Sequence, residues 1–374
     1  MANFSRIAIF SPSLRGGGAE RFVVNLACGL NKYNYKVDLL LAKADCHFLS
    51  SLADNVRIID FNRNRVLFCF YDLVKYIRDE NPPILLSVQS HANIIAILAN
   101  MFSSSKTRLV VSERNTTSIL SKMSPMPKDH LLPILEHFFY SKSDAIVAVS
   151  QGVADDLKSR IRNIQSKVKV IYNPVVNNKL IVKSKLKPNH KWFNEKKGKI
   201  VLAAGRLNPA KDFLNLINAF YIVRKTINAR LIIIGEGKDR PILENIINRL
   251  DIKGYVCLPG FVSNPFSYMS HSDVFVLSSR IEGLPAVLIE AMACGVPVVA
   301  TDCPSGPREI LEDGKYGQLV PVGDKFRLAE AIKLTLERPG DIEGARLRAK
   351  EFSSEIATQK YLELFKSLLS ESGG

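Results

Sequence analysis

The sequence predicts an α/β protein of two doubly wound parallel-sheet domains that face each other across a cleft. Short apolar strands alternate along the chain with amphipathic helical stretches, the pattern of a parallel sheet covered by helices on both faces. The two halves also begin alike, with a strand, a glycine-containing loop and a helix, in RIAIFSPSLRGGGAERF and KIVLAAGRLNPAKDF. The length of 374 residues favours two domains, since a domain usually takes about 100 to 200 residues.

The N-terminal domain is expected over residues 1–175. Its predicted strands are Ile7–Phe10, Val37–Leu41, Val56–Asp60, Ile84–Ser87, Leu109–Val111, Ala145–Val149 and Val168–Ile171, and its predicted helices are 19–31, 66–80, 91–101, 129–142 and 150–160. The periodicity stops after Asn173-Pro174, and the eight lysines of residues 176–199 predict a linker.

The C-terminal domain is expected over residues 200–352. Its predicted strands are Ile200–Ala203, Leu231–Ile234, Val256–Leu258, Val274–Leu277 and Val298–Ala300, and its predicted helices are 211–227, 239–251, 284–294 and 325–336. The last residues, 353–374, carry a helical pattern over Ser353–Leu369, which we expect to pack back on the N-terminal domain.

The composition excludes several classes of protein. With 47% hydrophobic and 23% charged residues, the chain is not disordered, collagenous or coiled-coil. The six cysteines are scattered without a CxxC pair, so neither a disulfide framework nor a zinc site is predicted. The N-terminal apolar run is too short for a signal peptide, and the longest uncharged run, Asn81 to Ser105, is a poor membrane span. We therefore expect a cytoplasmic protein.

The net charge of +15 is unevenly distributed. Lys and Arg outnumber Asp and Glu by 22 to 14 in residues 1–175 and by 8 to 1 in residues 176–200, whereas residues 201–374 carry 21 of each sign. The excess indicates an anionic partner for the first half, such as lipid headgroups, a pyrophosphate or nucleic acid. Nucleic acid is the weakest of these because few aromatic residues accompany the lysines. The alternative is a solvated basic surface.

The segment SSRIEGLPAVLIEAMACG, residues 278–295, is the most specific in the chain. Pro285 at its start and Gly295 at its end predict a helix, whose free N–H groups and positive dipole end suit a diphosphate. Glu282 precedes this helix and Glu290 lies inside it, roughly 12 Å apart if the stretch is helical throughout. Two carboxylates at that separation suit a sugar and a ribose, and are too distant for a glycosidase pair. The alternative for Glu290 is a helix residue that faces water.

Two cations follow the first strand of the C-terminal domain. Arg206 ends the strand and Lys211 begins the next helix, so both can reach one pyrophosphate. A pair of ordinary surface charges is the alternative. The chain contains no Asp-x-Asp, so neutralisation of the diphosphate would fall to these cations and the helix end, and no metal or other cofactor is predicted.

Other loops predict binding with weaker signals. Gly235 and the pair Phe261 and Val262 follow further strands and could hold a nucleobase, although ordinary turns explain them equally well. In the first half, Gly16, Gly17 and Gly18 permit an anion-binding backbone, or only a flexible turn, and they do not match GxGxxG. The polar residues that end two other strands of this half are predicted to contact a sugar or an acceptor: His91, Glu113, Arg114 and Asn115. For His91 a structural role is the alternative.

These motifs resemble the retaining GT-B glycosyltransferases of family 4, the group 1 glycosyl transferases, most closely those that build bacterial surface glycans. The resemblance covers nearly the whole chain. It is carried by GGGAER, SERN, VAVSQGVADDL, VIYNPV, GRLNPAKDF, GEGKDRPILENII, LPGFVSNPFSYM and EGLPAVLIEAMACGVPVVATDCPSGPREIL, in which Glu282 and Glu290 fit the E-x7-E pattern. A histidine common in relatives before residue 113 is replaced here by Glu113-Arg114, so we assign its role to no residue.

The resemblance implies two Rossmann-like domains and metal-independent transfer, with retention, from a UDP-sugar to a lipid-linked glycan. Arg206 and Lys211 would contact the diphosphate, Glu290 the ribose, and Glu282 with Gly283, Leu284 and Pro285 the transferred sugar. Residues Gly16–Gly18 would lie under the donor phosphates and the acceptor. UDP-GalNAc, UDP-GlcNAc and UDP-Gal are the first candidates. Work on a lipid-linked acceptor would bring the basic N-terminal half to the inner face of the cytoplasmic membrane. The alternative is a nucleotide-sugar 2-epimerase with the same two-domain plan. The absence of an acidic catalytic set from the first half of the sequence argues against it.

Overall fold

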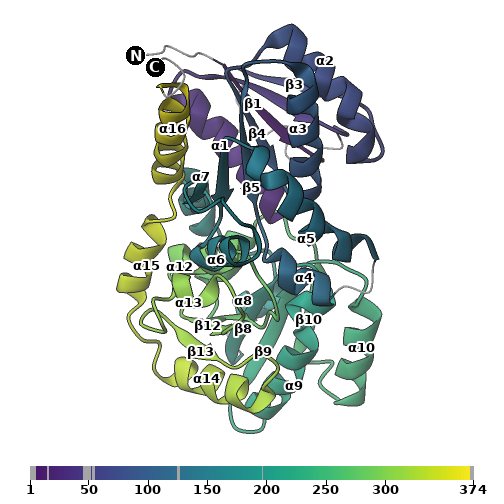
Figure 1. Ribbon diagram of the computed structural model, residues 1–374. Helices are drawn as coiled ribbons and strands as arrows, with labels where there is room; N and C mark the ends of the chain where they lie inside the picture. The colour runs from purple at the N-terminus through teal and green to yellow at the C-terminus, as the bar shows by residue number, and fades with distance from the viewer. Residues whose placement is uncertain are drawn as a thin grey trace. The chain divides into compact units, whose positions relative to one another are not determined.

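The computed structural model describes residues 6–14, 17–44, 52, 55–123, 127–195 and 197–370, with the backbone alone for 127–129. The chain forms two units, of which unit 1 joins Met1–Pro174 to Ser354–Gly374 and unit 2 is Val175–Ser353. Each unit is built on one parallel sheet with helices against it (Figure 1), which confirms the predicted fold class.

Unit 1 has a seven-stranded sheet in the order β3-β2-β1-β4-β5-β6-β7. The strands are β1 Arg6–Ser11, β2 Lys36–Leu41, β3 Val56–Asp60, β4 Ile84–Val88, β5 Arg108–Glu113, β6 Ala145–Ala148 and β7 Val168–Val170. The helices are α1 Gly18–Lys32, η2 Val66–Cys69, α2 Phe70–Glu80, α3 Ser90–Ser103, α4 Thr117–Met123, α5 Pro127–Phe139, η3 Tyr140–Lys142, α6 Gln151–Arg160 and α16 Ser354–Ser370. The predicted helix 129–142 thus becomes α5 and η3, and α4 lies where the sequence suggested no helix.

Helix α16 returns the end of the chain to unit 1, beside α1 (Figure 1). The Tyr361 ring lies 5.9 Å from that of Phe22 on α1, and both side chains belong to the core built around β1 and β2. Gly29 allows the close approach, because a Cβ there would lie 2.2 Å from the hydroxyl oxygen of Thr358. A small residue on α1 therefore sets the depth at which the last helix packs.

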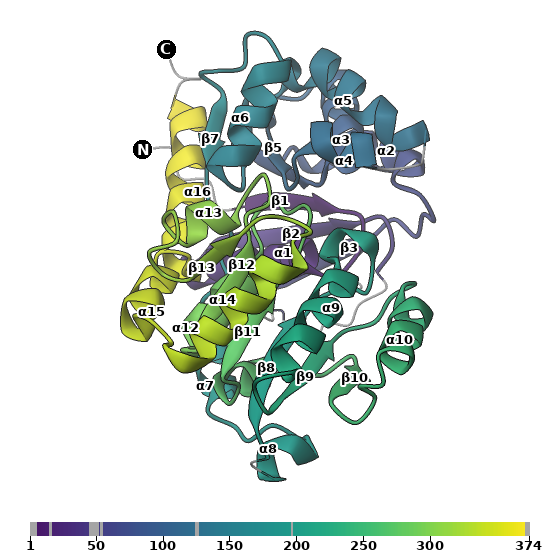
Figure 2. The same cartoon turned by 90° about the horizontal axis from the view of Figure 1, so that it is seen from below.

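Unit 2 has a six-stranded sheet in the order β10-β9-β8-β11-β12-β13. The strands are β8 Lys199–Ala204, β9 Ala229–Ile234, β10 Val256–Gly260, β11 Val274–Leu277, β12 Val298–Thr301 and β13 Gln318–Val320. The helices are α7 Asn178–Ser184, α8 Lys191–Glu195, η4 Pro209–Lys211, α9 Phe213–Arg224, α10 Arg240–Arg249, α11 Pro265–Ser270, α12 Ala286–Cys294, α13 Pro307–Ile310, α14 Lys325–Glu337 and α15 Ile342–Lys350. Helices α9 and α14 lie side by side over one face of the sheet (Figure 2).

The lysine-rich segment 176–199 belongs to unit 2 and is not the separate linker that its composition suggested. Each of its two short helices buries one apolar side chain, Leu180 on α7 and Trp192 on α8. The backbone is also held from outside the segment, since Tyr268 Oη donates to the Asn189 carbonyl at 2.8 Å. One buried apolar side chain per short helix is too sparse to produce a periodic apolar signal.

Within the described residues, no helix has both the length and the apolar character that crossing a membrane requires.

Candidate functional site

In unit 2, the order of strands changes direction beside β8. Strand β8 pairs with β9 on one side and with β11 on the other, so the loops 205–212 and 278–285 leave the sheet from adjacent strands. Such a switch point at the carboxyl edge is where open α/β sheets bind ligands. These loops carry the three residues predicted to be catalytic.

Lys211 and Glu282 meet directly. The ammonium nitrogen of Lys211 lies 2.5 Å from Glu282 Oε1, and both side chains are largely buried. Ser279 Oγ also donates to the same carboxylate oxygen, at 2.6 Å. A cation and an acid from different strands are thus held together in one place, where Glu282 keeps the Lys211 charge in position.

Three further contacts join the two loops, and three of the residues that make them, Ser278, Arg280 and Asp212, were not among the predicted site residues. The Arg280 backbone N–H donates to the Ala210 carbonyl at 2.8 Å, and its side chain donates to Asp212 Oδ2 at 2.7 Å. Ser278 Oγ donates to the Lys211 carbonyl at 2.8 Å. Asp212 has a left-handed φ of 47° and is the N-cap of α9, where its side chain accepts a hydrogen bond from the Asn215 backbone N–H. Lys211 therefore belongs to η4, and α9 begins only at Phe213, two residues later than the predicted start of the helix 211–227. An Asp directly after Lys211 was the sequence signal for this helix start.

The loop before α12 is held in an extended form. The predicted helix 284–294 begins two residues later, at Ala286, with Pro285 as its N-cap at ψ 94°. Ser305 Oγ donates to the Gly283 carbonyl at 2.8 Å. Gly306, with φ 94°, lies so close to Pro285 that a Cβ on it would be 2.4 Å from Pro285 Cδ, so only glycine fits there. Gly295 closes the helix in the left-handed conformation, as predicted. The N-terminal N–H groups of α12 therefore follow directly on the segment that carries Glu282.

Arg206 stands apart from this network. Arg206 is exposed and follows Gly205, the first residue after β8. Within the described part of the chain, its side chain contacts neither Lys211 nor Glu282. An exposed guanidinium on the same loop as a fixed ammonium is available to an anionic ligand.

Glycines bring the ends of β8, β9 and β10 together. Gly235 has φ 135°, and a Cβ there would lie 2.0 Å from the carbonyl oxygen of Gly205. Its N–H donates to the Gly260 carbonyl at 2.9 Å. Phe261 follows, with 69% of its surface exposed, and Val262 is half-buried. The predicted contact of these two residues with a nucleobase stays a prediction. The ring of Phe261 is exposed at the end of β10, where a base could stack on it.

Glu290 is buried in the middle of α12, with 5% of its surface exposed. The alternative of a carboxylate that faces water is therefore wrong. The predicted ribose contact of Glu290 remains a prediction. Because α12 begins only at Ala286, Glu282 lies outside the helix, and the distance of roughly 12 Å estimated for a stretch that is helical throughout does not apply.

In unit 1, the predicted glycine loop leads into α1. Gly16 lies outside the described residues. Gly17 is the N-cap of α1, with an extended backbone, and Gly18 is its first residue, with open space where a Cβ would be. Gly17 has no side chain that could cap this 15-residue helix, so its first N–H groups receive no side-chain hydrogen bond from the N-cap.

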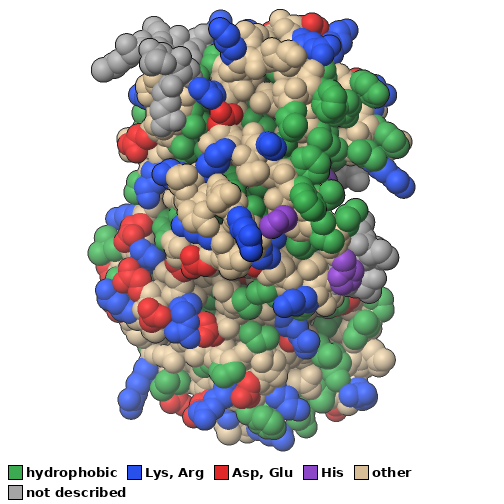
Figure 3. Space-filling model, viewed as in Figure 1, with side chains coloured by type: hydrophobic (Ala, Val, Ile, Leu, Met, Phe, Trp, Pro, Cys, Tyr) green, Lys and Arg blue, Asp and Glu red, His purple; other side chains and the backbone are tan. Residues whose placement is uncertain are grey.

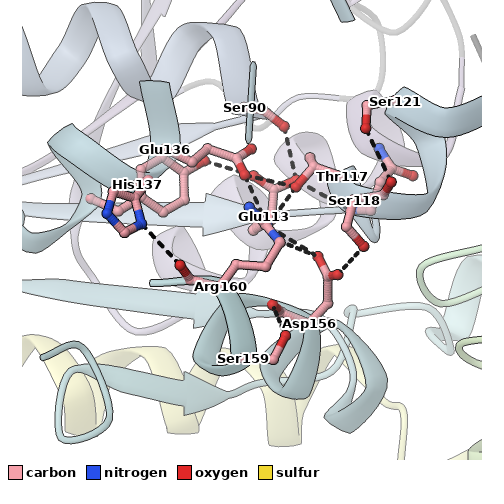
Figure 4. Close-up of polar contacts among 12 residues, drawn as sticks. Ser90, Glu113, Thr117, Ser118, Ser121, Glu136, His137, Asp156, Ser159 and Arg160 are labelled. Carbon is pink, nitrogen blue, oxygen red and sulfur yellow. Dashed lines mark hydrogen bonds and ion pairs between the residues drawn. The ribbon is translucent and has the colours of Figure 1, made fainter. Parts of the chain in front are cut away.

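Glu113, at the end of β5, is completely buried and is held by the chain itself (Figure 4). Tyr140 Oη donates to Oε2 at 2.6 Å, and Ser90 Oγ donates to Oε1 at 2.9 Å. The backbone N–H groups of Arg114 and Asn115 also donate to Oε1. Burial raises the pKa of Glu113, and these donors oppose the shift. The geometry makes Glu113 an internal support for the loop that follows β5.

The other predicted acceptor contacts differ in exposure. Arg114 is buried, with its guanidinium 3.9 Å from the centre of the Phe22 ring, and its Nη1 has no hydrogen-bond partner among the described residues. Burial lowers the pKa of Arg114 to about 10, so it stays charged at neutral pH. His91, in the first turn of α3, and Asn115 are both exposed. Their contacts with a sugar or an acceptor stay predictions.

A second buried carboxylate, Glu136 of α5, lies close to this site (Figure 4). Thr117 Oγ1 donates to Glu136 Oε2 at 2.7 Å, and Arg160 Nη2 lies 3.0 Å from the same oxygen. Arg160 is shared with Asp156, also at 3.0 Å. Burial, and then the charge of Glu113, raises the pKa of Glu136 to about 8.

This shift predicts a pH dependence of stability. Because folded Glu136 binds its proton more tightly than an unfolded glutamate of pKa 4.5, the free energy of unfolding should fall as pH rises from 4.5 to about 8. One such group contributes at most about 1.4 kcal/mol per pH unit. Urea unfolding across this range should show a shallower pH slope for Glu136→Gln than for the wild type. An unchanged slope would mean that Glu136 is ionised throughout.

Two family descriptions match the sequence. Residues 16–178 match "Glycosyltransferase Family 4", and residues 186–353 match "Glycosyl transferases group 1". Among curated proteins, the chain is 31% identical to the N-acetylgalactosamine-N,N'-diacetylbacillosaminyl-diphospho-undecaprenol 4-alpha-N-acetylgalactosaminyltransferase of Campylobacter jejuni, over 93% of this chain and 95% of the relative. A second alpha-1,4-N-acetyl-D-galactosaminyltransferase of the same organism, named for a diNAcBac-PP-undecaprenol substrate, is 26% identical over 96% and 98%.

Solved structures agree on the fold. Sucrose-phosphate synthase of Thermosynechococcus elongatus superimposes with a TM-score of 0.82 at 19% identity, over 98% of this chain and all of the other. HepE of Anabaena, solved in complex with UDP and glucose, superimposes with a TM-score of 0.79 at 21% identity, over 97% of this chain and 100% of the other.

Proposed function

This chain belongs to the group 1, family 4 glycosyltransferases of the GT-B fold, and on that premise we propose that it moves a hexose or N-acetylhexosamine from a UDP-sugar to a lipid-linked glycan. The product would enter a bacterial surface polysaccharide or a glycoprotein glycan. The observation that carries the proposal is the Lys211–Glu282 pair at the switch point of unit 2, directly before α12. The epimerase alternative has no comparable support.

The donor is assigned from charge and from the relatives. A diphosphate needs cations and N–H groups, and Lys211, Arg206 and the N-terminus of α12 offer both within two adjacent loops. Phe261 offers an exposed ring for a base. Both curated relatives are named as N-acetylgalactosaminyltransferases, so UDP-GalNAc comes before UDP-GlcNAc and UDP-Gal.

The mechanism follows from where charge develops. As the bond between the sugar and UDP breaks, negative charge grows on the leaving diphosphate, and Lys211, Arg206 and the α12 N–H groups would stabilise it. Their positive charge would serve without a metal ion. Retention would result from attack of the acceptor hydroxyl on the face that UDP leaves, with a leaving phosphate oxygen accepting its proton. Glu282 would hold the transferred sugar and keep Lys211 in place.

The acceptor is assigned more coarsely. The two relatives are named for undecaprenol-diphosphate-linked glycans, and a polyprenyl-diphosphate-linked glycan is the corresponding proposal here. Such an acceptor lies in the inner face of the cytoplasmic membrane. The cytoplasmic enzyme would work there, with the basic excess of its N-terminal half toward anionic headgroups.

A thermal-shift screen of UDP-sugars tests the donor. A ligand at 100 times its Kd stabilises the folded protein by about 2.7 kcal/mol, so the true donor should raise the melting temperature clearly. We expect Arg206→Ala to weaken UDP binding about tenfold, the effect of losing one charge-assisted hydrogen bond. Arg308→Ala, an exposed arginine of the same unit, is the control and should bind UDP normally. A wild-type Kd in Arg206→Ala would remove Arg206 from the donor site.

A further inference from the structure

Helix α5 exposes apolar side chains and buries an acidic one, the reverse of what is usual for a surface helix. Leu131, Ile134 and Phe138 point outward, with 50, 53 and 65% of their surfaces exposed, whereas Glu136 of the same helix is completely buried. The three apolar residues follow helical spacing, so they form one stripe. A helix that faces water normally buries its apolar stripe and exposes its acids.

The neighbouring elements expose large apolar side chains as well. Leu67 and Phe68 on η2, Tyr71 on α2, and Met101 and Phe102 on α3 each expose between 52 and 80% of their surface. Inside α3, by contrast, Asn93 is completely buried and donates to the Tyr140 hydroxyl. The reversal is therefore a property of this side of unit 1 and not of one helix.

These residues form one continuous surface. The Phe70 ring lies 5.1 Å from that of Tyr71 and 5.8 Å from that of Phe102, which joins α2 to the end of α3. Helix α3 packs in turn against η2 and α5. Figure 3 shows the hydrophobic side chains gathered over α2, α3 and α5. We name this surface the apolar face: Leu67, Phe68, Tyr71, Met101, Phe102, Leu131, Ile134 and Phe138.

Exposed cations accompany the apolar face. Lysines follow three of its aromatic residues by four positions, in the pairs Tyr71 and Lys75, Phe102 and Lys106, and Phe138 and Lys142. On α2, Asp72 pairs with Arg63 and Glu80 with Arg6 and Arg57, whereas Asp79 is exposed and forms no ion pair with the described residues. The three lysines therefore outnumber the one unpaired acid of α2, and a positive margin beside apolar side chains is the complement of negative headgroups above hydrocarbon.

We infer that the apolar face inserts its side chains into the interfacial region of an anionic phospholipid bilayer while its lysines contact the headgroups. The inference deepens the proposed function, because a lipid-linked acceptor would be reached from such a position. Large apolar side chains exposed at this density are unusual on a soluble monomer and mark an interaction site. The positive margin selects the bilayer over a second copy of this chain, whose identical lysines would repel.

Co-sedimentation with vesicles tests the inference. We expect the wild type to bind vesicles of phosphatidylcholine with 30% phosphatidylglycerol about tenfold or more better than phosphatidylcholine alone, and to lose binding at high salt. Ile134→Asp combined with Phe138→Asp should reduce binding at least tenfold. Lys75→Ala, Lys106→Ala and Lys142→Ala together should abolish the dependence on phosphatidylglycerol while the residual binding to neutral vesicles remains.

A matched control comes from unit 2. Phe326 and Leu347 are exposed to the same degree as Phe138 and Ile134, so Phe326→Asp combined with Leu347→Asp makes the same chemical change elsewhere. This control should bind vesicles like the wild type. Equal loss in both double variants would overturn the inference, since the effect would then reflect added negative charge alone.

The result can be separated from the proposed function. UDP-sugar thermal shift needs no vesicles, and the Ile134→Asp, Phe138→Asp variant should keep the wild-type shift. If the wild type shows the UDP-sugar thermal shift but does not bind vesicles, only the membrane role of the apolar face is rejected. If it binds vesicles but shows no thermal shift, only the donor assignment is rejected. A concentration-dependent dimer that this variant abolishes, without vesicle binding by the wild type, would assign the face to a second copy and reject the bilayer.

Discussion

Replacement of Lys211 by alanine is expected to lower kcat for sugar transfer about 10²–10³-fold. The residue supplies a preorganised positive charge where the leaving diphosphate becomes more negative, and loss of one such group typically costs that factor. Since Glu282, which itself accepts a hydrogen bond from Ser279, already holds the Lys211 ammonium in place, the wild type spends no energy on orienting it during the reaction. Steady-state kinetics with saturating UDP-sugar measures the effect on kcat separately from donor binding.

Lys315→Ala is the matched control for this variant. Lys315 lies in the same unit and also pairs with a glutamate, Glu312, but both side chains are exposed. Its kcat should stay within about twofold of the wild type, because exposed ion pairs contribute little. A Lys211→Ala enzyme that keeps more than a tenth of the wild-type kcat would show that the leaving group is stabilised elsewhere.

Replacement of Arg160 by methionine should destabilise unit 1, and more so at alkaline pH. At pH 6 the Glu136 carboxyl is protonated, and the loss should be about 1–2 kcal/mol for the broken hydrogen bonds. At pH 8.5, just above its pKa of about 8, the wild-type carboxyl is largely ionised. Without its cation the carboxyl would take up a proton again, which adds at most about 1 kcal/mol to the loss. Urea unfolding at the two pH values measures both free energies.

Arg308→Met provides the comparison. Arg308 also contacts two carboxylates, Asp302 and Asp313, but it is exposed, so its removal should cost less than about 1 kcal/mol at either pH. The double variant Glu136→Gln, Arg160→Met should recover part of the stability at pH 8.5, because no carboxyl then has to take up a proton. Equal destabilisation by Arg160→Met at pH 6 and 8.5 would contradict the raised pKa of Glu136.

Much of the fold was predictable because its signals are local. Strand and helix periodicity recurs within about ten residues, and the terminating Gly295 acts on its own helix. The adjacency of the loops with Lys211 and Glu282 was also within reach, since both follow strands of one parallel sheet. The direct contact between the two side chains was not, because it depends on the hydrogen bonds that Arg280 and Ser278 make across the loops.

Exposure was the property that the sequence conveyed least. Glu113 was expected to contact a sugar or an acceptor from a polar loop, and it is completely buried, whereas the burial of Glu290 agrees with the interpretation that it does not face water. The sequence predicted an amphipathic helix over 129–142, with no indication that Glu136 would face inward and Phe138 outward. Which side of a helix is covered depends on elements distant in the chain, and no window of sequence contains them.

By itself, then, the sequence determined the family, the two parallel sheets and the loops that carry the chemistry, because strand order and turn residues are encoded where they occur. Only the tertiary structure decided how closely α16 packs on α1, that the lysine-rich segment belongs to unit 2, and that Glu113 and Glu136 are withdrawn from water. These outcomes depend on long-range packing, in which small residues such as Gly29 and Gly306 permit close approach and buried charges must find partners within reach.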